Sequence, residues 1–281
     1  MKRIIDIAAV VIIAMVCLCG CSAGFVNGSA VKYDNADKYT AGDREITDKI
    51  DSLDIDWVSG SVKVTAGGSN VSVKETTKGE LEDKYKVHTW AEGRTLHVRF
   101  CKSGERYDGS EPKTLEITVP ADILYEDIRA DASSADIEFE GVNSKKTVMD
   151  ASSGNMTYKG DAESFTADTS SGNISFTGKA ADIHTDSSSG GVFIRQEGEA
   201  DSISVDTSSG DIEIDSDYTA SLKADSSSGD KVITLRKMPK KVHLDSSSGG
   251  VKLYLPEDAD FTANIDTSSG EVDYEFAMSK T

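Results

Sequence analysis

The chain has 281 residues, of which 28% are charged and 37% are hydrophobic, and its formal net charge is -19. This composition excludes a protein embedded in a membrane along its whole length. The charge disfavours nucleic acid and anionic lipid headgroups as partners, because their phosphate groups would be repelled, whereas cations, basic proteins and neutral glycans remain compatible with it.

The first segment, residues 1–20, is typical of a lipoprotein signal peptide. Two basic residues precede an apolar run from Ile7 to Cys19, which is too short for a comfortable bilayer span. The sequence Leu18-Cys19-Gly20-Cys21 then resembles the bacterial lipobox, whose last cysteine is acylated and becomes the new N-terminus. We therefore expect lipidation at Cys21 and an extracytoplasmic protein anchored to the cell membrane. An ordinary secretory signal or a short membrane anchor is the alternative.

Residues 21–48 are polar and lack apolar periodicity, so we expect a flexible tether there. Once the signal peptide is removed and Cys21 is lipidated, Cys101 is the remaining thiol of the sequence, and no intramolecular disulfide can form. Cys101 follows the strand-like run from Leu96 to Phe100. We expect it to be a small buried hydrophobic residue and not a nucleophile.

Residues 49–130 contain short runs in which apolar and polar positions alternate, separated by turn residues, and this pattern predicts half-buried strands and hairpins. One stretch, Asp56-Trp57-Val58-Ser59-Gly60, resembles a degenerate copy of the repeat that follows. We therefore expect an irregular N-terminal β region that is continuous with the repeats and whose hairpins cap their N-terminal end.

Residues 131–281 contain repeated copies of a unit that begins Asp-x-Ser-Ser-Gly, with alanine replacing glycine in the first copy. The anchor aspartates are Asp131, Asp150, Asp168, Asp186, Asp206, Asp225, Asp245 and Asp266. Consecutive anchors are 18 to 21 residues apart, which indicates one structural unit repeated along the chain. Apolar residues one and three positions before each anchor, and six and eight positions after it, predict two strands facing one narrow core.

A unit of about 19 residues with two short strands cannot bury its apolar face alone, so successive units must stack with their strands paired in parallel. The predicted fold is therefore all-β: a parallel β-solenoid with two-strand rungs ~4.8 Å apart. Lys231 interrupts an otherwise apolar column, and we expect a local bulge to turn this lysine toward solvent.

At the bends, the glycine suggests a positive φ, and we expect each aspartate to accept backbone N–H groups as an Asx-type cap in a structural turn ladder. Cation binding by the column of carboxylates is the alternative. Repulsion between neighbours ~4.8 Å apart is about 0.9 kcal/mol in water. A hydrogen bond to a charged group contributes roughly 1.5–3 kcal/mol. We therefore predict a structural ladder, with no metal site and no cofactor.

The sequence also lacks a recognisable catalytic motif. Its four histidines do not cluster, and it contains no phosphate-binding glycine loop, nucleophile elbow, HExxH or paired CxxC. The alternative is an enzyme in which acidic and basic side chains on adjacent rungs of the solenoid carry out catalysis. Two outward columns of the repeat, two positions before and seven positions after each anchor, do not bring two carboxylates together on neighbouring rungs, as glycoside hydrolysis requires. We therefore predict a noncatalytic protein.

Several stretches resemble one bacterial family closely: Tyr33 to Asp43, Ile55 to Val62, Phe100 to Gly104, and the Asp-x-Ser-Ser-Gly array. On these stretches the chain is similar to the "putative adhesin" family of β-strand-repeat domains, a domain of unknown function. The resemblance implies a lipid-anchored surface β-solenoid without catalytic residues.

The predicted function is binding of a glycan, an envelope polymer or a protein at the bacterial cell surface. A structural or envelope-stress-response component at the membrane is the alternative, and a carbohydrate-active β-helix enzyme is the third hypothesis. The chain stops soon after its last repeat without a capping element, so self-association through the C-terminal strand edge is a further expectation.

Overall fold

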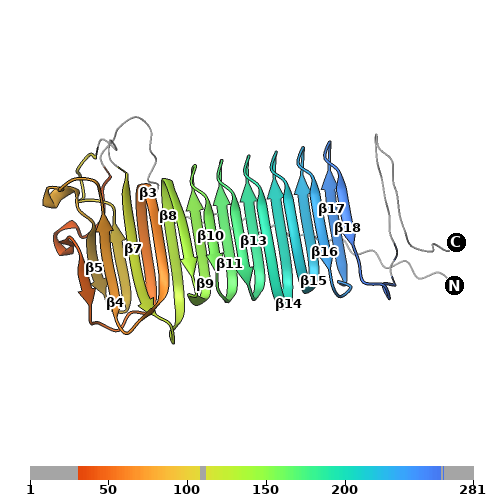
Figure 1. Cartoon of the computed structure of the whole chain (residues 1–281), viewed down its shortest axis with the longest axis horizontal. Helices are drawn as coiled ribbons and strands as arrows, with labels where there is room; N and C mark the ends of the chain where they lie inside the picture. Colours follow the sequence, from red (N-terminus) through yellow and green to blue (C-terminus); the bar gives the residue numbers. More distant parts are fainter. Residues whose placement is uncertain (1–30, 108–111, 261, 263–281) are drawn as a thin grey trace.

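The computed structural model describes residues 31–107, 112–260 and 262. Within these ranges the regular structure is β-sheet, apart from two 3₁₀ turns, η1 (Ala36–Lys38) and η2 (Asp83–Tyr85). The strands form one continuous sheet coiled into an elongated solenoid, with an irregular cap at one end (Figure 1). No helix in the described part of the chain is long and apolar enough to cross a membrane.

The regular part of the solenoid makes about seven turns with a spacing of about 19 residues. Its strands are β8 (Leu124–Glu140), β9 (Asn143–Ala151), β10 (Met156–Lys159), β11 (Ala162–Thr169), β12 (Ile174–Gly178), β13 (Ala180–Ser187), β14 (Val192–Thr207), β15 (Ile212–Ser226), β16 (Lys231–Leu235), β17 (Lys241–Ser246) and β18 (Val251–Tyr254). Each strand pairs in parallel with its equivalent in the next rung. The predicted parallel β-solenoid is therefore confirmed.

The core is a narrow column of side chains enclosed by the two strands of each rung. Its most aromatic part contains Phe139, Tyr158, Phe165 and Phe176, whose neighbouring ring centroids lie 4.9–5.9 Å apart. Such pairs contribute about 0.5–1.5 kcal/mol each beyond the burial of their surface. The hydroxyl of Tyr158 donates to the carbonyl oxygen of Val142 at 2.8 Å, so its polar end is also satisfied inside the core.

Lys231 lies inside this core, and the prediction that a bulge turns it to solvent is wrong. Strands β15 and β16 pair without interruption, with Ile212 opposite Lys231, and the lysine side chain is fully buried. Its Nζ donates to the carbonyl oxygen of Ser226 at 3.3 Å. Burial lowers the pKa of Lys231, although Asp225 opposes this effect. The long lysine stem can follow the core to a polar carbonyl at the bend, so the strand does not need to bulge.

The cap consists of antiparallel hairpins around β3 (Ser52–Gly68). The other strands of the cap are β1 (Thr40–Ala41), β2 (Arg44–Ile46), β4 (Val71–Thr76), β5 (His88–Glu92), β6 (Thr95–Arg99) and β7 (Lys113–Pro120). Strand β3 pairs in parallel with β6 and β7 on one side and with β8 on the other. Outside them, β4 and β5 pair antiparallel with β7 and β6, and the short β2 and β1 pair with β4 and β5. Short outer strands present few unpaired backbone groups to other chains.

The degenerate copy in the sequence forms a rung directly beside the regular repeats. Asp56 lies opposite Asp131 and Gly60 opposite Ala135 in the register of β3 and β8. The two aspartates are 75 residues apart in the chain (131 minus 56). The hairpins and the outer rung of the cap are therefore an insertion between two neighbouring rungs.

The described part of the segment expected to be a tether, residues 31–48, packs against the cap. Tyr39 meets Trp90 edge-on with 5.6 Å between ring centroids, and Ile46 is buried. The backbone N–H of Tyr33 donates to Ser103 Oγ at 2.8 Å. Periodicity does not reveal this packing because the contacts come from isolated residues. The predicted signal peptide, Cys21 and the rest of the tether lie outside the described residues.

Candidate functional site

The anchor aspartates form one column along the solenoid. The strand registers place Asp131, Asp150, Asp168, Asp186, Asp206, Asp225 and Asp245 opposite one another from rung to rung, with Asp56 before them. Asp266 lies outside the described residues. The register therefore stacks these carboxylates in one column along the solenoid.

Cations neutralise parts of this column. Nε of Arg129 lies 2.7 Å from Asp131, and Nζ of Lys223 lies 3.0 Å from Asp206 and 2.9 Å from Asp225. Farther along the column, Arg129 acts to lower the pKa of Asp150 and His184 acts to lower that of Asp168, but burial outweighs both effects.

Two carboxyl groups of this part of the column have raised pKa values. Burial raises the pKa of Asp150 to about 6, and the neighbouring Asp131 carboxylate adds to this effect. Burial and the charge of Asp186 also raise the pKa of Asp168. No group of three or more metal-ligating side chains is placed to hold a metal ion within the described residues.

The bends are capped by the residue that directly follows the anchor aspartate when this residue is threonine or serine. Its hydroxyl, and not the anchor carboxylate, accepts the hydrogen bond. In four successive bends the glycine N–H donates to that hydroxyl at 2.8–3.0 Å: Gly172 to Thr169, Gly190 to Ser187, Gly210 to Thr207, and Gly229 to Ser226. The expected Asx-type cap is wrong at these bends. Alternation along a strand turns the anchor outward and the next residue inward, so the hydroxyl reaches the bend from inside the solenoid.

A ladder of hydrogen bonds between rungs is formed by aspartate and asparagine side chains five positions after the anchor. We did not predict this ladder from the sequence. The side-chain oxygens of Asp136, Asn155 and Asn173 each accept the backbone N–H of the equivalent residue in the next rung, at 2.8–3.0 Å. Asp211 and Asp230 continue the ladder at 2.9 and 2.7 Å. The signal that could have revealed it is aspartate or asparagine at this position in five of the eight copies.

The bend glycines are required by contact between rungs. A Cβ on Gly172 would lie 1.8 Å from the carbonyl oxygen of Gly154, and one on Gly190 would lie 1.7 Å from that of Gly172. The predicted positive φ is wrong for the regular bends, since none of their described glycines adopts it, whereas Gly60 in the degenerate copy has a φ of 96°. Ala135, which replaces the bend glycine, lies opposite this irregular residue.

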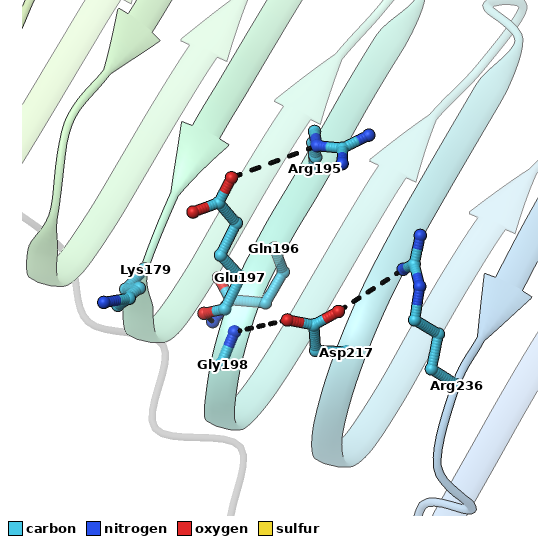
Figure 2. Close-up of a pocket in the computed structure, with 7 residues that line it drawn as sticks. All are labelled: Lys179, Arg195, Gln196, Glu197, Gly198, Asp217 and Arg236. Atoms are coloured by element: carbon cyan, nitrogen blue, oxygen red, sulfur yellow. Dashed lines mark hydrogen bonds and ion pairs between the residues drawn. The ribbon is translucent and has the colours of Figure 1, made fainter.

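A charged recess of about 370 Å³ interrupts the regular surface at the opposite bends (Figure 2). It is lined by Lys179, Arg195, Gln196, Glu197, Gly198, Asp217 and Arg236. The unit from residue 186 to 206 has 20 residues, against 18 in each of the two units before it. The register of β14 and β15 shifts between Gln196 and Glu199, where Gly198 has a φ of 73°. The longer unit therefore contains the break in register, and its residues Arg195, Gln196, Glu197 and Gly198 line the recess.

The recess is held in shape by alternating cations and carboxylates. Arg195 lies 3.5 Å from Asp215, and Arg236 pairs with both Asp215 and Asp217. The N–H of Gly198 donates to Asp217 at 2.9 Å, as Figure 2 shows. Guanidinium donors and carboxylate acceptors that are fixed in this way can bind the hydroxyl groups of a polar ligand.

A cluster of polar side chains on the cap consists of Asp54, His97 and Arg99, which bind one another. Asp54 lies 2.6 Å from both His97 and Arg99, and although burial opposes the effect, these hydrogen bonds lower the pKa of Asp54 to about 2. Cys101 is buried as expected, and burial raises the pKa of its thiol to about 11. A thiol with so high a pKa is protonated at neutral pH and is a poor nucleophile.

The chain matches one protein family in sequence and several solved structures in fold. Residues 50–281 match the family described as Toastrack DUF4097. No curated protein matches the chain. A solved structure described as a "putative adhesin" from Bacteroides fragilis is 15% identical with a TM-score of 0.50, over 78% of this chain and 97% of that one.

Two similar structures come from Parabacteroides distasonis. One, described as a "putative adhesin", is 16% identical with a TM-score of 0.48, over 79% of this chain and 98% of the other. The second, described as a "putative lipid binding protein", is 17% identical with a TM-score of 0.45, over 77% and 96% of the two chains. At these identities the likeness concerns the fold and not the ligand.

Proposed function

This chain belongs to the Toastrack DUF4097 family, whose name assigns no activity, and from its structure we propose that it is a noncatalytic binding module of the cell surface. The observation that carries this proposal is the charged recess of Lys179, Arg195, Asp217 and Arg236, the feature that departs from the regular repeat. A neutral polyhydroxylated glycan or envelope polymer fits it best. Its lining offers both donors and acceptors, while the net charge of -19 disfavours polyanions.

Lipidation at Cys21 is the second part of this proposal. The chain enters the described fold beside the cap, where Tyr33 contacts Ser103. An anchor at Cys21 would therefore hold the cap nearest the membrane. The recess, formed around β14 and β15, would lie several rungs farther out, where a surface polymer can reach it (Figure 1).

The test is capture of ligands by the chain from residue 22 onward, using a panel of neutral and acidic glycans and the envelope polymers of the producing cell. We expect a saturable neutral glycan whose affinity falls at least about tenfold in Arg236→Ala, because a hydrogen bond to a charged group contributes about 1.5–3 kcal/mol. Lys145→Ala is the matched control, since Lys145 pairs with Glu126 on the exposed surface of a different rung. The absence of any saturable ligand, or equal affinities in both variants, contradicts the proposal.

A structural or envelope-stress role is the alternative, and the ladder of aspartate and asparagine oxygens favours it because it links successive rungs along a long surface without forming a recess. A deletion strain would then lose tolerance to envelope stress, and the Arg236→Ala variant would restore it fully. For self-association, we propose the C-terminal edge, where the last described strand, β18, leaves Val251 and Tyr254 exposed. Sedimentation over a range of protein concentrations tests this, and a monomer at all concentrations rejects it.

A further inference from the structure

A buried ion pair in the cap lies apart from both the repeat and the charged recess. Lys113, the first residue of β7, is fully buried, and its Nζ lies 2.6 Å from Oε1 of Glu75 on β4. The side chain of Glu75 is 5% exposed. In the antiparallel pairing of these strands Glu75 lies opposite Leu115, two residues from Lys113. The backbone register therefore holds the amine against the carboxylate.

The surroundings of Lys113 exclude water. Its Nζ lies over three aromatic rings, 3.9 Å from the centroid of Phe100, 4.9 Å from that of Trp57 and 5.6 Å from that of Tyr107. Burial lowers the pKa of Lys113, although Glu75 opposes this effect. Transfer of one proton from the ammonium to the adjacent carboxylate replaces two buried charges with two neutral groups, which reduces the desolvation cost.

The two carboxyl oxygens of Glu75 have different surroundings. Oε2 accepts the backbone N–H of Val87 at 3.0 Å, whereas Oε1 is buried and faces Nζ at 2.6 Å. A backbone N–H at Oε2 can stabilise negative charge that develops on this oxygen when the amine attacks. The carbonyl oxygens of Tyr85 and Phe100 accept the other hydrogens of Nζ and fix its orientation.

We propose that Lys113 and Glu75 condense into an intramolecular amide bond that joins β7 to β4. After the proton transfer, Nζ attacks the carboxyl carbon and forms the C–N bond. The bond from that carbon to Oε1 then breaks, and Oε1 leaves as hydroxide, which takes one proton from the nitrogen. One molecule of water is released, no redox change occurs, and no further reactant is required.

The bond would close a covalent ring from residue 75 to residue 113 in the cap. A ring of this size restricts the unfolded chain and stabilises the folded cap for the same reason as a disulfide of equal span. It would do so in a chain whose described residues contain one free cysteine and no disulfide. The proposal does not depend on the ligand of the recess.

The test is mass spectrometry of the purified full chain, first intact and then after digestion with trypsin. We expect a mass lower by one water molecule, no cleavage after Lys113, and one branched product containing both Lys113 and Glu75. Lys231 is the internal control, because it is equally buried but donates to a backbone carbonyl, so the chain should be cleaved after it.

Glu75→Ala should restore the mass calculated for that sequence and cleavage after Lys113. The double variant Glu75→Gln/Lys113→Met keeps the side-chain volumes without an amine, and it guards against loss of folding in the single variant. A wild-type chain with its full calculated mass and two separate peptides overturns the proposal. Loss of water confined to any other peptide also overturns it.

Discussion

Replacement of a bend glycine provides the sharpest test of how the rungs are held together. In Gly190→Ala the new Cβ would lie 1.7 Å from the carbonyl oxygen of Gly172 in the preceding rung. Contacts below about 3 Å do not occur for real Cβ atoms, so the two rungs must separate at this bend. The neighbouring Gly191→Ala is the matched control, because its Cβ would meet the end of the Phe193 ring at 3.1 Å, and this half-exposed side chain can turn away.

The magnitude follows from the hydrogen bonds that cross the same bend. Ser188 donates to Thr169 at 3.1 Å and Ser189 to Ser170 at 3.1 Å, while Gly191 accepts from Ile174 at 2.9 Å. Separation of the rungs by more than an ångström lengthens all three beyond hydrogen-bonding distance. Each backbone bond contributes about 1 kcal/mol, so we expect Gly190→Ala to lose about 3 kcal/mol of unfolding free energy.

The assay is urea unfolding followed by far-ultraviolet circular dichroism for the wild type and both variants. We expect Gly191→Ala to change the unfolding free energy by less than about 1 kcal/mol, since alanine also reduces the entropy of the unfolded chain. Equal losses in the two variants would refute the argument that close contact between rungs selects glycine. A wild-type unfolding curve for Gly190→Ala would refute it as well.

Three further predictions concern buried polar groups. Thr207→Val removes the acceptor of the Gly210 N–H and should cost about 1–3 kcal/mol in urea unfolding, whereas Thr207→Ser should retain most of the stability. Asp150 has a folded-state pKa of about 6, above its unfolded value, so its contribution to stability is present at low pH and is lost as the pH rises from about 4 through 6. Asp150→Asn should flatten that part of the melting temperature profile, and an unchanged slope would count against the shift. Lys231→Met keeps the volume but removes a buried charge, so thermal unfolding should show equal or greater stability; a loss above about 2 kcal/mol would contradict the reasoning.

The sequence was sufficient for the solenoid because two independent periodicities agree. Alternation within each unit predicts strands, and the spacing of the anchors predicts their parallel stacking. Even the degenerate copy at Asp56 proved to be a rung in register with Asp131. What the pattern could not supply was the identity of the partners inside each bend. The alternation already turns Thr207 inward and Asp206 outward, but it does not show that the Thr207 hydroxyl accepts the N–H of Gly210.

The candidate site was less predictable for a related reason. The charged recess arises from one unit that is longer than its neighbours, and a difference of two residues does not show which side chains line the result. The prediction that Lys231 is exposed was wrong because the sequence does not reveal that the carbonyl oxygen of Ser226 accepts its hydrogen bond. The contact between Glu75 and Lys113 depends on hairpins outside the repeat, where no periodicity fixes the register.

The insertion of the cap between two adjacent rungs also determines the order in which the chain can fold. Strand β3 is synthesised before its neighbours: β6 and β7 can cover one edge once residue 120 has been made, but the edge that pairs with β8 stays unpaired until about residue 140. Closing the 75-residue loop from Asp56 to Asp131 costs about 1.2 kcal/mol more than closing a loop of 19 residues. Each later rung needs the preceding one alone as its template. Shortening the chain from its C-terminal end should therefore remove rungs one at a time, whereas a break before residue 140 removes the template for all of them.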